Sequence, residues 1–191
     1  MSYMNYNRSD QPTKLDQNAD TNLDQDVAHA RNIKYQNSQL EVKQYLYDIV
    51  AGKYPVFATK YGINNRSELE SIDLMELLKD GEILCRLGSL LEIPTNPTQK
   101  FKNSKMPFIQ MENISFFLSL CQIIDINQNE IFQTVDLFES KDPYQIIITI
   151  MSFSRIANSL DPTNFPIVIG PKPIKTKPQI PVKPFKLRQY N

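Results

Sequence analysis

The sequence predicts an all-α domain, a compact bundle of about four main helices plus short ones. Apolar residues recur at intervals of three and four in several stretches of the 191-residue chain. Aspartate and proline mark helix starts, and the one β-branched run has no second strand candidate to pair with. The domain is expected at residues 37–170, after an N-terminal extension (1–36) and before a basic, proline-rich tail (171–191).

The N-terminal extension is rich in Asn, Asp and Gln and lacks periodicity, so disorder is predicted there, with at most a transient helical turn. Its histidine, His29, is the only one in the chain and cannot form a metal site alone. The first stable helix is predicted to begin at the capping box Ser38–Glu41 and to end at Gly52. Tyr45 lies on its apolar face, so the Tyr45 hydroxyl needs a partner in the core.

Residues 54–66 are predicted to form an irregular connector. After it, Asp73 is expected to cap a short helix, and the Asp80-Gly81 pair separates that helix from the next one. Two prolines end the second of these helices before a basic loop around Phe101. The loop is either simply solvated or a secondary contact for an acidic partner. Its three cations are Lys100, Lys102 and Lys105.

A long helix is predicted from Pro107, which suits a first helical turn, to about Asp125. Apolar residues spaced for one buried face are Phe108, Met111, Ile114, Phe117, Leu118, Cys121 and Ile124. Polar residues expected on the opposite side are Gln110, Glu112, Asn113 and Gln122. A short helix with its own apolar residues should follow, between residues 131 and 138.

The last helix is predicted to start at the Asp142-Pro143 pair, which reads as an N-cap followed by proline at the first helical position. The β-branched run after it favours a strand by local propensity, but length, cap and the later spacing favour a buried helix. We expect this to be the central helix of the domain. Beyond it, an extended strap should pack back on the bundle through Phe165, Ile167, Val168 and Ile169.

Several of these segments resemble the single calponin-homology domain of the transgelin and calponin family. They are SKMPFIQMENISFFL with EIFQTVDLFESKD, DLMELLKDGEILCRLGSLL upstream, and residues 150–158 downstream. The resemblance covers about residues 38–171 and implies an all-α domain linked to actin filaments. The family's first helix usually carries a tryptophan, whose place Tyr45 takes. The family often ends in a glycine-rich repeat, which is not found here, so cross-linking is expected to rest on the domain surface and the basic tail.

Composition narrows the function classes. The formal net charge is zero, which gives no general attraction to nucleic acid or an anionic membrane. Cys85 and Cys121 are expected to be buried free thiols, and no segment is predicted to direct secretion or membrane insertion. No catalytic constellation, metal site or cofactor motif is found. A cytoplasmic, monomeric, non-enzymatic protein is therefore predicted.

The two ends of the chain differ in charge. Residues 1–26 hold five aspartates against Arg8 and Lys14, a net charge of −3. Residues 170–191 hold six cations and no acid, a net charge of +6. Such a segment attracts an acidic surface of the kind that actin filaments present, and the family resemblance suggests the same partner. The predicted filament-binding residues are Lys172, Lys175, Lys177, Lys183, Lys186 and Arg188.

The tail also contains a predicted ligand for an SH3 domain. In a polyproline II helix, with three residues per turn, Pro178 and Pro181 lie on one face, as SH3 grooves require. Lys183, Pro184 and Leu187 extend the pattern to PxxPx+PxxL, which resembles ligands of SH3 proteins in cortical actin patches. The alternative is an accidental match, because a tail of proline and lysine generates PxxP easily.

These observations predict a protein of the cortical actin cytoskeleton that binds and cross-links, or bundles, actin filaments through the domain and the basic tail. The resemblance is to fungal-type transgelins. One alternative is a signalling adaptor whose domain binds a partner other than actin and whose tail recruits SH3 proteins. Microtubule binding is a third possibility, because some calponin-homology domains bind microtubules.

Overall fold

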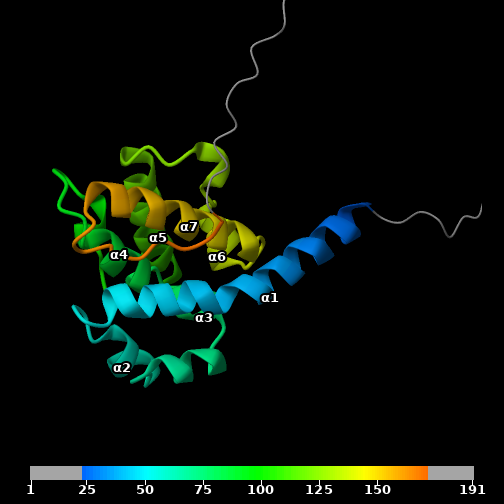
Figure 1. The fold of residues 1–191 in the computed structure, drawn as a ribbon, viewed down its shortest axis with the longest axis horizontal. Coiled ribbons are helices and arrows are strands. Elements are labelled where there is room, and N and C mark those ends of the chain that lie inside the picture. Colours follow the sequence, from blue (N-terminus) through cyan, green and yellow to red (C-terminus); the bar gives the residue numbers. More distant parts are fainter. Residues whose placement is uncertain (1–22, 172–191) are drawn as a thin grey trace, which may run out of the picture.

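The computed structural model describes residues 23–171, which form a helical bundle with no strand in that range (Figure 1). The predicted all-α architecture is confirmed. Its α-helices are α1 (Leu23–Val50), α2 (Val56–Tyr61), α3 (Leu74–Leu78), α4 (Glu82–Ser89), α5 (Pro107–Ile123), α6 (Thr134–Phe138) and α7 (Pro143–Leu160). Three short 3-10 helices join them, at Arg66–Ser71, Pro97–Lys100 and Gln128–Glu130.

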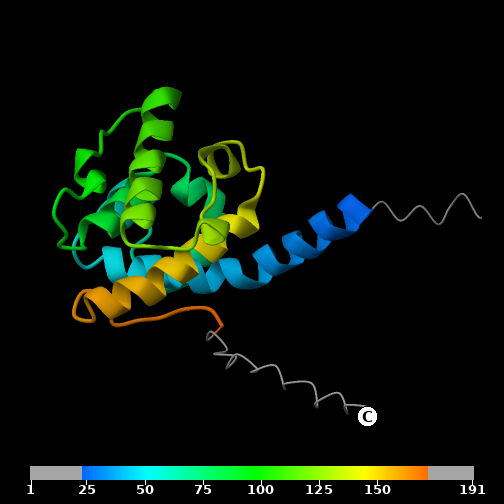
Figure 2. The same ribbon diagram turned by 90° about the horizontal axis from the view of Figure 1, so that it is seen from above.

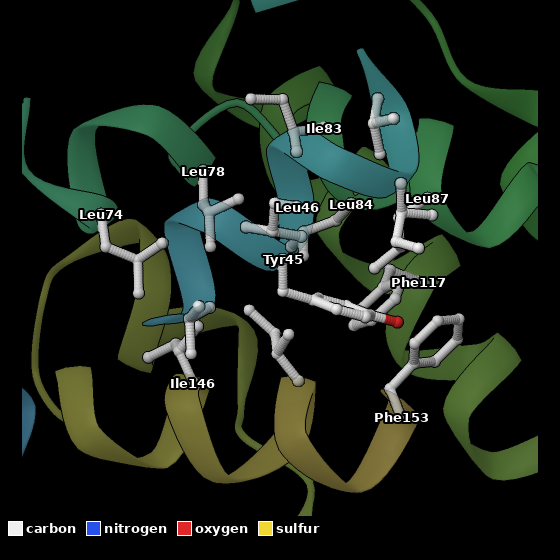
Figure 3. Packing of buried hydrophobic residues seen from close by; sticks show 14 of the residues in the cluster. Tyr45, Leu46, Leu74, Leu78, Ile83, Leu84, Leu87, Phe117, Ile146 and Phe153 are labelled. Carbon is white, nitrogen blue, oxygen red and sulfur yellow. The ribbon is translucent and has the colours of Figure 1, made fainter. Parts of the chain in front are cut away.

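The core lies where α1, α4, α5 and α7 meet. Tyr45 of α1, Leu87 of α4, Phe117 of α5 and Phe153 of α7 each expose 1% of their surface or less (Figure 3). The Phe117 and Phe153 rings lie 5.3 Å apart between centroids. None of these helices could bury its apolar stripe alone, so their mutual packing is the main source of stability.

Two predicted helix starts, at Asp73 and Asp142, are confirmed, because each carboxylate caps a backbone amide close to it in the sequence. The Asp73 carboxylate accepts a hydrogen bond from the Met75 amide at 2.8 Å, and Asp142 accepts one from the Gln145 amide at 3.2 Å. Gly81 has φ of +73°, and a Cβ atom there would lie 2.8 Å from the Cβ of Asn113. Glycine therefore allows both the left-handed turn and the close approach of α5.

Helix α1 is much longer than predicted. It begins at Leu23, so the disorder predicted for the extension is wrong for residues 23–36, and Ser38 and Glu41 lie inside the helix. Figures 1 and 2 show the first turns of α1 projecting beyond the bundle. Closer to the bundle, the Arg31 guanidinium of α1 forms an ion pair with the Asp142 carboxylate at 2.7 Å, which attaches this part of the helix to the start of α7. Residues 1–22 lie outside the described residues.

Two smaller expectations are also wrong. Residues 56–61 of the predicted irregular connector form helix α2, which ends at Gly62 in a left-handed conformation, φ +68°. The buried Tyr45 hydroxyl has no hydrogen-bond partner among residues 23–171, although a partner was expected. Burial without a partner raises the pKa of Tyr45 above its usual range.

Candidate functional site

The predicted binding residues fall into two groups. Those of the tail, both the six cations and the SH3 ligand pattern Pro178, Pro181, Lys183, Pro184 and Leu187, lie outside the residues that the structure describes. The second group is the basic loop between the Pro97–Lys100 helix and α5, which is described in full. The geometry at the tail's point of origin and at this loop therefore defines the candidate site.

The strap predicted after α7 fixes where the tail starts. Phe165 is fully buried, with its ring 5.8 Å from that of Phe153. Its carbonyl oxygen accepts a hydrogen bond from the Asn158 side chain at 2.8 Å, and the Ile169 amide donates to the Ser154 hydroxyl at 3.2 Å. Ile167 and Val168, which were expected to pack inward, are 36% and 47% exposed.

Gly170 completes this attachment. Its amide donates to the Glu41 carboxylate of α1 at 3.3 Å, and its φ is +84°. A Cβ atom at this position would lie 2.6 Å from the Met151 sulfur. The chain therefore leaves the bundle alongside α1 and α7 by a path that only glycine fits at this residue.

The basic loop is held from inside by Asn113. The Lys102 amide donates to the Asn113 side-chain oxygen at 3.1 Å, and the Asn113 amide nitrogen donates to the carbonyl oxygens of Lys102 at 2.9 Å and Asp80 at 3.2 Å. Asn113 is 1% exposed, so its predicted place on the solvent side of α5 is wrong. Satisfied hydrogen bonds make its burial possible.

The lysines of this loop point outward. Lys100, Lys102 and Lys105 are all exposed. Lys102 lies 3.0 Å from the Glu112 carboxylate, whereas Lys100 and Lys105 take part in none of the ion pairs formed within residues 23–171. Phe101 packs inward under the Arg86 guanidinium, 4.8 Å from its ring centroid. The loop thus presents net positive charge on a fixed frame.

Sequence reasoning missed one part of this region. Phe108 was assigned to the buried face of α5, but it is 70% exposed, and the neighbouring Met106 is 64% exposed. Met106 is the N-cap of α5 and Phe108 is its second residue. The first turns of α5 extend beyond the neighbouring helices (Figure 2). Periodicity alone does not reveal where along a helix the packing partners stop.

Other features offer little for chemistry. A shallow pocket of about 170 Å³ lies between α1 and the start of α7, but its Arg31 is bound to Asp142 and lies 5.5 Å from the Tyr144 ring centroid. Cys85 and Cys121 are buried free thiols, as predicted, and burial raises the pKa of Cys85 to about 12. In residues 23–171 no cluster of three or more potential metal ligands occurs, and no helix is long and apolar enough to cross a membrane.

Comparison with known proteins assigns the family. The family model described as the calponin homology (CH) domain matches residues 60–159, a span that runs from the end of α2 to the end of α7. The chain belongs to the calponin homology family. Helix α1 precedes the matched CH span, but its inner residues complete the same core.

The similar proteins point to the transgelin and calponin branch. A Saccharomyces cerevisiae protein named Transgelin is 38% identical over 177 residues, 88% of this chain and 79% of that protein. A Schizosaccharomyces pombe Transgelin is 37% identical over 57% of this chain and 61% of its own length. Myophilin of Echinococcus granulosus is 38% identical over 51% of this chain and 50% of its own. This CH family is non-enzymatic in kind, and membership supports a general actin-binding, cytoskeletal role.

Proposed function

We propose that this protein cross-links actin filaments in the cortical cytoskeleton of the cytoplasm, with the CH domain as one contact and the basic tail as the other. The observation that carries the proposal is the charge of residues 170–191, six cations and no acid, directly after the strap. A cationic segment of this kind is attracted to the acidic surface of a filament. The buried strap gives that segment a fixed origin on the bundle.

Cross-linking by a monomer requires two separate contacts on one molecule. Two linked contacts also strengthen each other, because the second binds at the effective concentration set by the link between them. The strap supports this arrangement, since Phe165 and Ile169 tie the start of the tail to the domain. Loss of either contact should then abolish bundling while leaving some binding.

Charge reversal in the tail tests the proposal. Changing Lys172, Lys175 and Lys177 to Glu replaces attraction by repulsion, so pelleting of the full-length protein with actin filaments should fall strongly. Changing the same three residues to Arg keeps the charge and serves as the matched control. The proposal is wrong if the wild-type protein stays in the supernatant with filaments at low salt, or if the Glu variant pellets like the Arg variant.

The SH3 ligand pattern supports a second, compatible role, the recruitment of an SH3 protein of the actin cortex by the tail. Changing Pro178 and Pro181 to Ala should abolish binding of a tail peptide to such a domain, because it removes both prolines from one polyproline face. Leu187→Ala should weaken binding, and actin binding should change little because no charge is lost. A peptide that binds no SH3 domain in a broad panel would identify the pattern as an accident of composition.

A further inference from the structure

The start of α5 carries the two most exposed large apolar side chains among residues 24–171, Phe108 at 70% and Met106 at 64%. They are two residues apart, on either side of Pro107. Figure 2 shows the first turns of α5 extending beyond the neighbouring helices. A large aromatic side chain on such a projection buries most of its surface only when another molecule covers it.

Hydrogen bonds hold the backbone that carries Met106 and Phe108 in place. Asn113 holds the preceding loop through both backbone groups of Lys102. The Ser104 hydroxyl accepts a hydrogen bond from the Met106 amide at 3.1 Å, and the Gln110 side chain donates to the Ser104 carbonyl oxygen at 3.5 Å. An apolar group on a preordered frame loses little conformational entropy on binding, so exposed Phe108 is well suited to be an anchor.

Three cations lie on the N-terminal side of the two apolar side chains in the sequence. Lys100, Lys102 and Lys105 precede them within eight residues and are exposed, and Glu112 offsets only one of these charges. An aromatic anchor with a charged rim is the usual composition of a protein interface. The complementary partner is an acidic protein surface with an apolar recess.

We propose that the α5 corner, defined as Lys100, Lys102, Lys105, Met106 and Phe108, is the contact that the CH domain itself makes with an actin filament. This inference rests on the proposed function and names the second of its two contacts. The lysines of the corner are complementary to an acidic surface, and the proposed function already brings the tail to the acidic surface of a filament. The corner binds weakly alone and strongly when the tail is also attached.

The test uses the full-length protein with Met106 and Phe108 both changed to Ala. Because both side chains are exposed, the melting temperature should not change. The control is Ile123→Ala, which removes a 56% exposed apolar side chain at the other end of α5. Low-speed sedimentation measures bundles and high-speed sedimentation measures total binding. The protein concentration needed for half-maximal bundling should rise about tenfold in the double variant and stay unchanged in the control.

Each outcome separates the two proposals. If the wild-type protein bundles filaments and the double variant bundles them equally well, the α5 corner is not the domain contact and the proposed function stands. If Ile123→Ala impairs bundling as much as the double variant does, the effect is not specific to the corner and the inference is wrong. If the wild-type protein neither binds nor bundles filaments, the proposed function fails and the inference fails with it.

Discussion

The inner and outer halves of α1 are one continuous helix, but different forces hold them. In the inner half, residues 38–50, Val42, Tyr45 and Leu46 expose 1% of their surface or less. In the outer half, residues 23–37, Val27 and Ile33 are 51% and 47% exposed. The inner half is held by apolar burial. The outer half is attached only near the bundle, where Tyr35 is 4% exposed and donates to Asp73, and where Arg31 binds Asp142. We therefore expect stability to depend strongly on one half and weakly on the other.

The largest expected difference comes from removing an apolar side chain in each half. Leu46→Ala creates a cavity in the core and should lower the free energy of unfolding by about 2–5 kcal/mol. Ile33→Ala, in the outer half, should change it by less than about 0.5 kcal/mol. Urea unfolding of both variants measures the contrast. Similar losses for the two would show that Ile33 is packed against another part of the molecule.

The two buried tyrosines of α1 should respond in opposite directions to loss of the hydroxyl. Tyr35 donates to Asp73 at 2.8 Å, and burial together with that carboxylate raises the pKa of Tyr35 above its usual range, so the donor stays protonated. Tyr35→Phe should cost about 1 kcal/mol. Tyr45→Phe removes a buried hydroxyl that has no partner among the described residues, and should stabilise by about 1 kcal/mol. A loss of stability in Tyr45→Phe would reveal a hydrogen bond to that hydroxyl.

The smallest expected effect concerns the ion pair that ties the outer half to α7. The Arg31 and Asp142 side chains are 36% and 34% exposed, so solvent screens their attraction. Arg31→Ala should lower the free energy of unfolding by at most about 1 kcal/mol, and the difference should shrink at high salt. Thermal unfolding at two salt concentrations measures it. A salt-independent loss would mean that Arg31 contributes through packing on Tyr144 instead.

The same contrast explains how far the sequence could predict the structure. Elements with local signals were predicted correctly, such as the Asp142-Pro143 start of α7 and the left-handed turn at Gly81. The outer half of α1 carries no apolar stripe, and its Asp142 and Asp73 partners lie far along the chain, so neither periodicity nor composition reveals it. The length of α1 therefore became visible only in three dimensions.

Only part of the candidate site could be predicted, because some of its features depend on contacts between segments far apart in the sequence. The cations of the loop could be read from the sequence, but the exposure of Phe108 and the burial of Asn113 could not. Asn113 is buried because backbone groups of Lys102 and Asp80, 11 and 33 residues away, satisfy its amide. Phe108 is the second residue of α5, whose first turns extend beyond the neighbouring helices (Figure 2). The filament and SH3 roles of the tail remain predictions.

The most direct test of a filament cross-linker with two contacts is co-sedimentation with actin filaments over a series of salt concentrations. The full-length protein should pellet at low salt and release steeply as salt rises, because exposed tail charges act through a field with a Debye length of about 8 Å at physiological salt. A chain ending at Pro171 should pellet weakly at every salt concentration, yet melt at nearly the same temperature, since the described core ends by Ile169. Equal pelleting of the two chains, or a full-length protein that stays in the supernatant at low salt, would contradict this account.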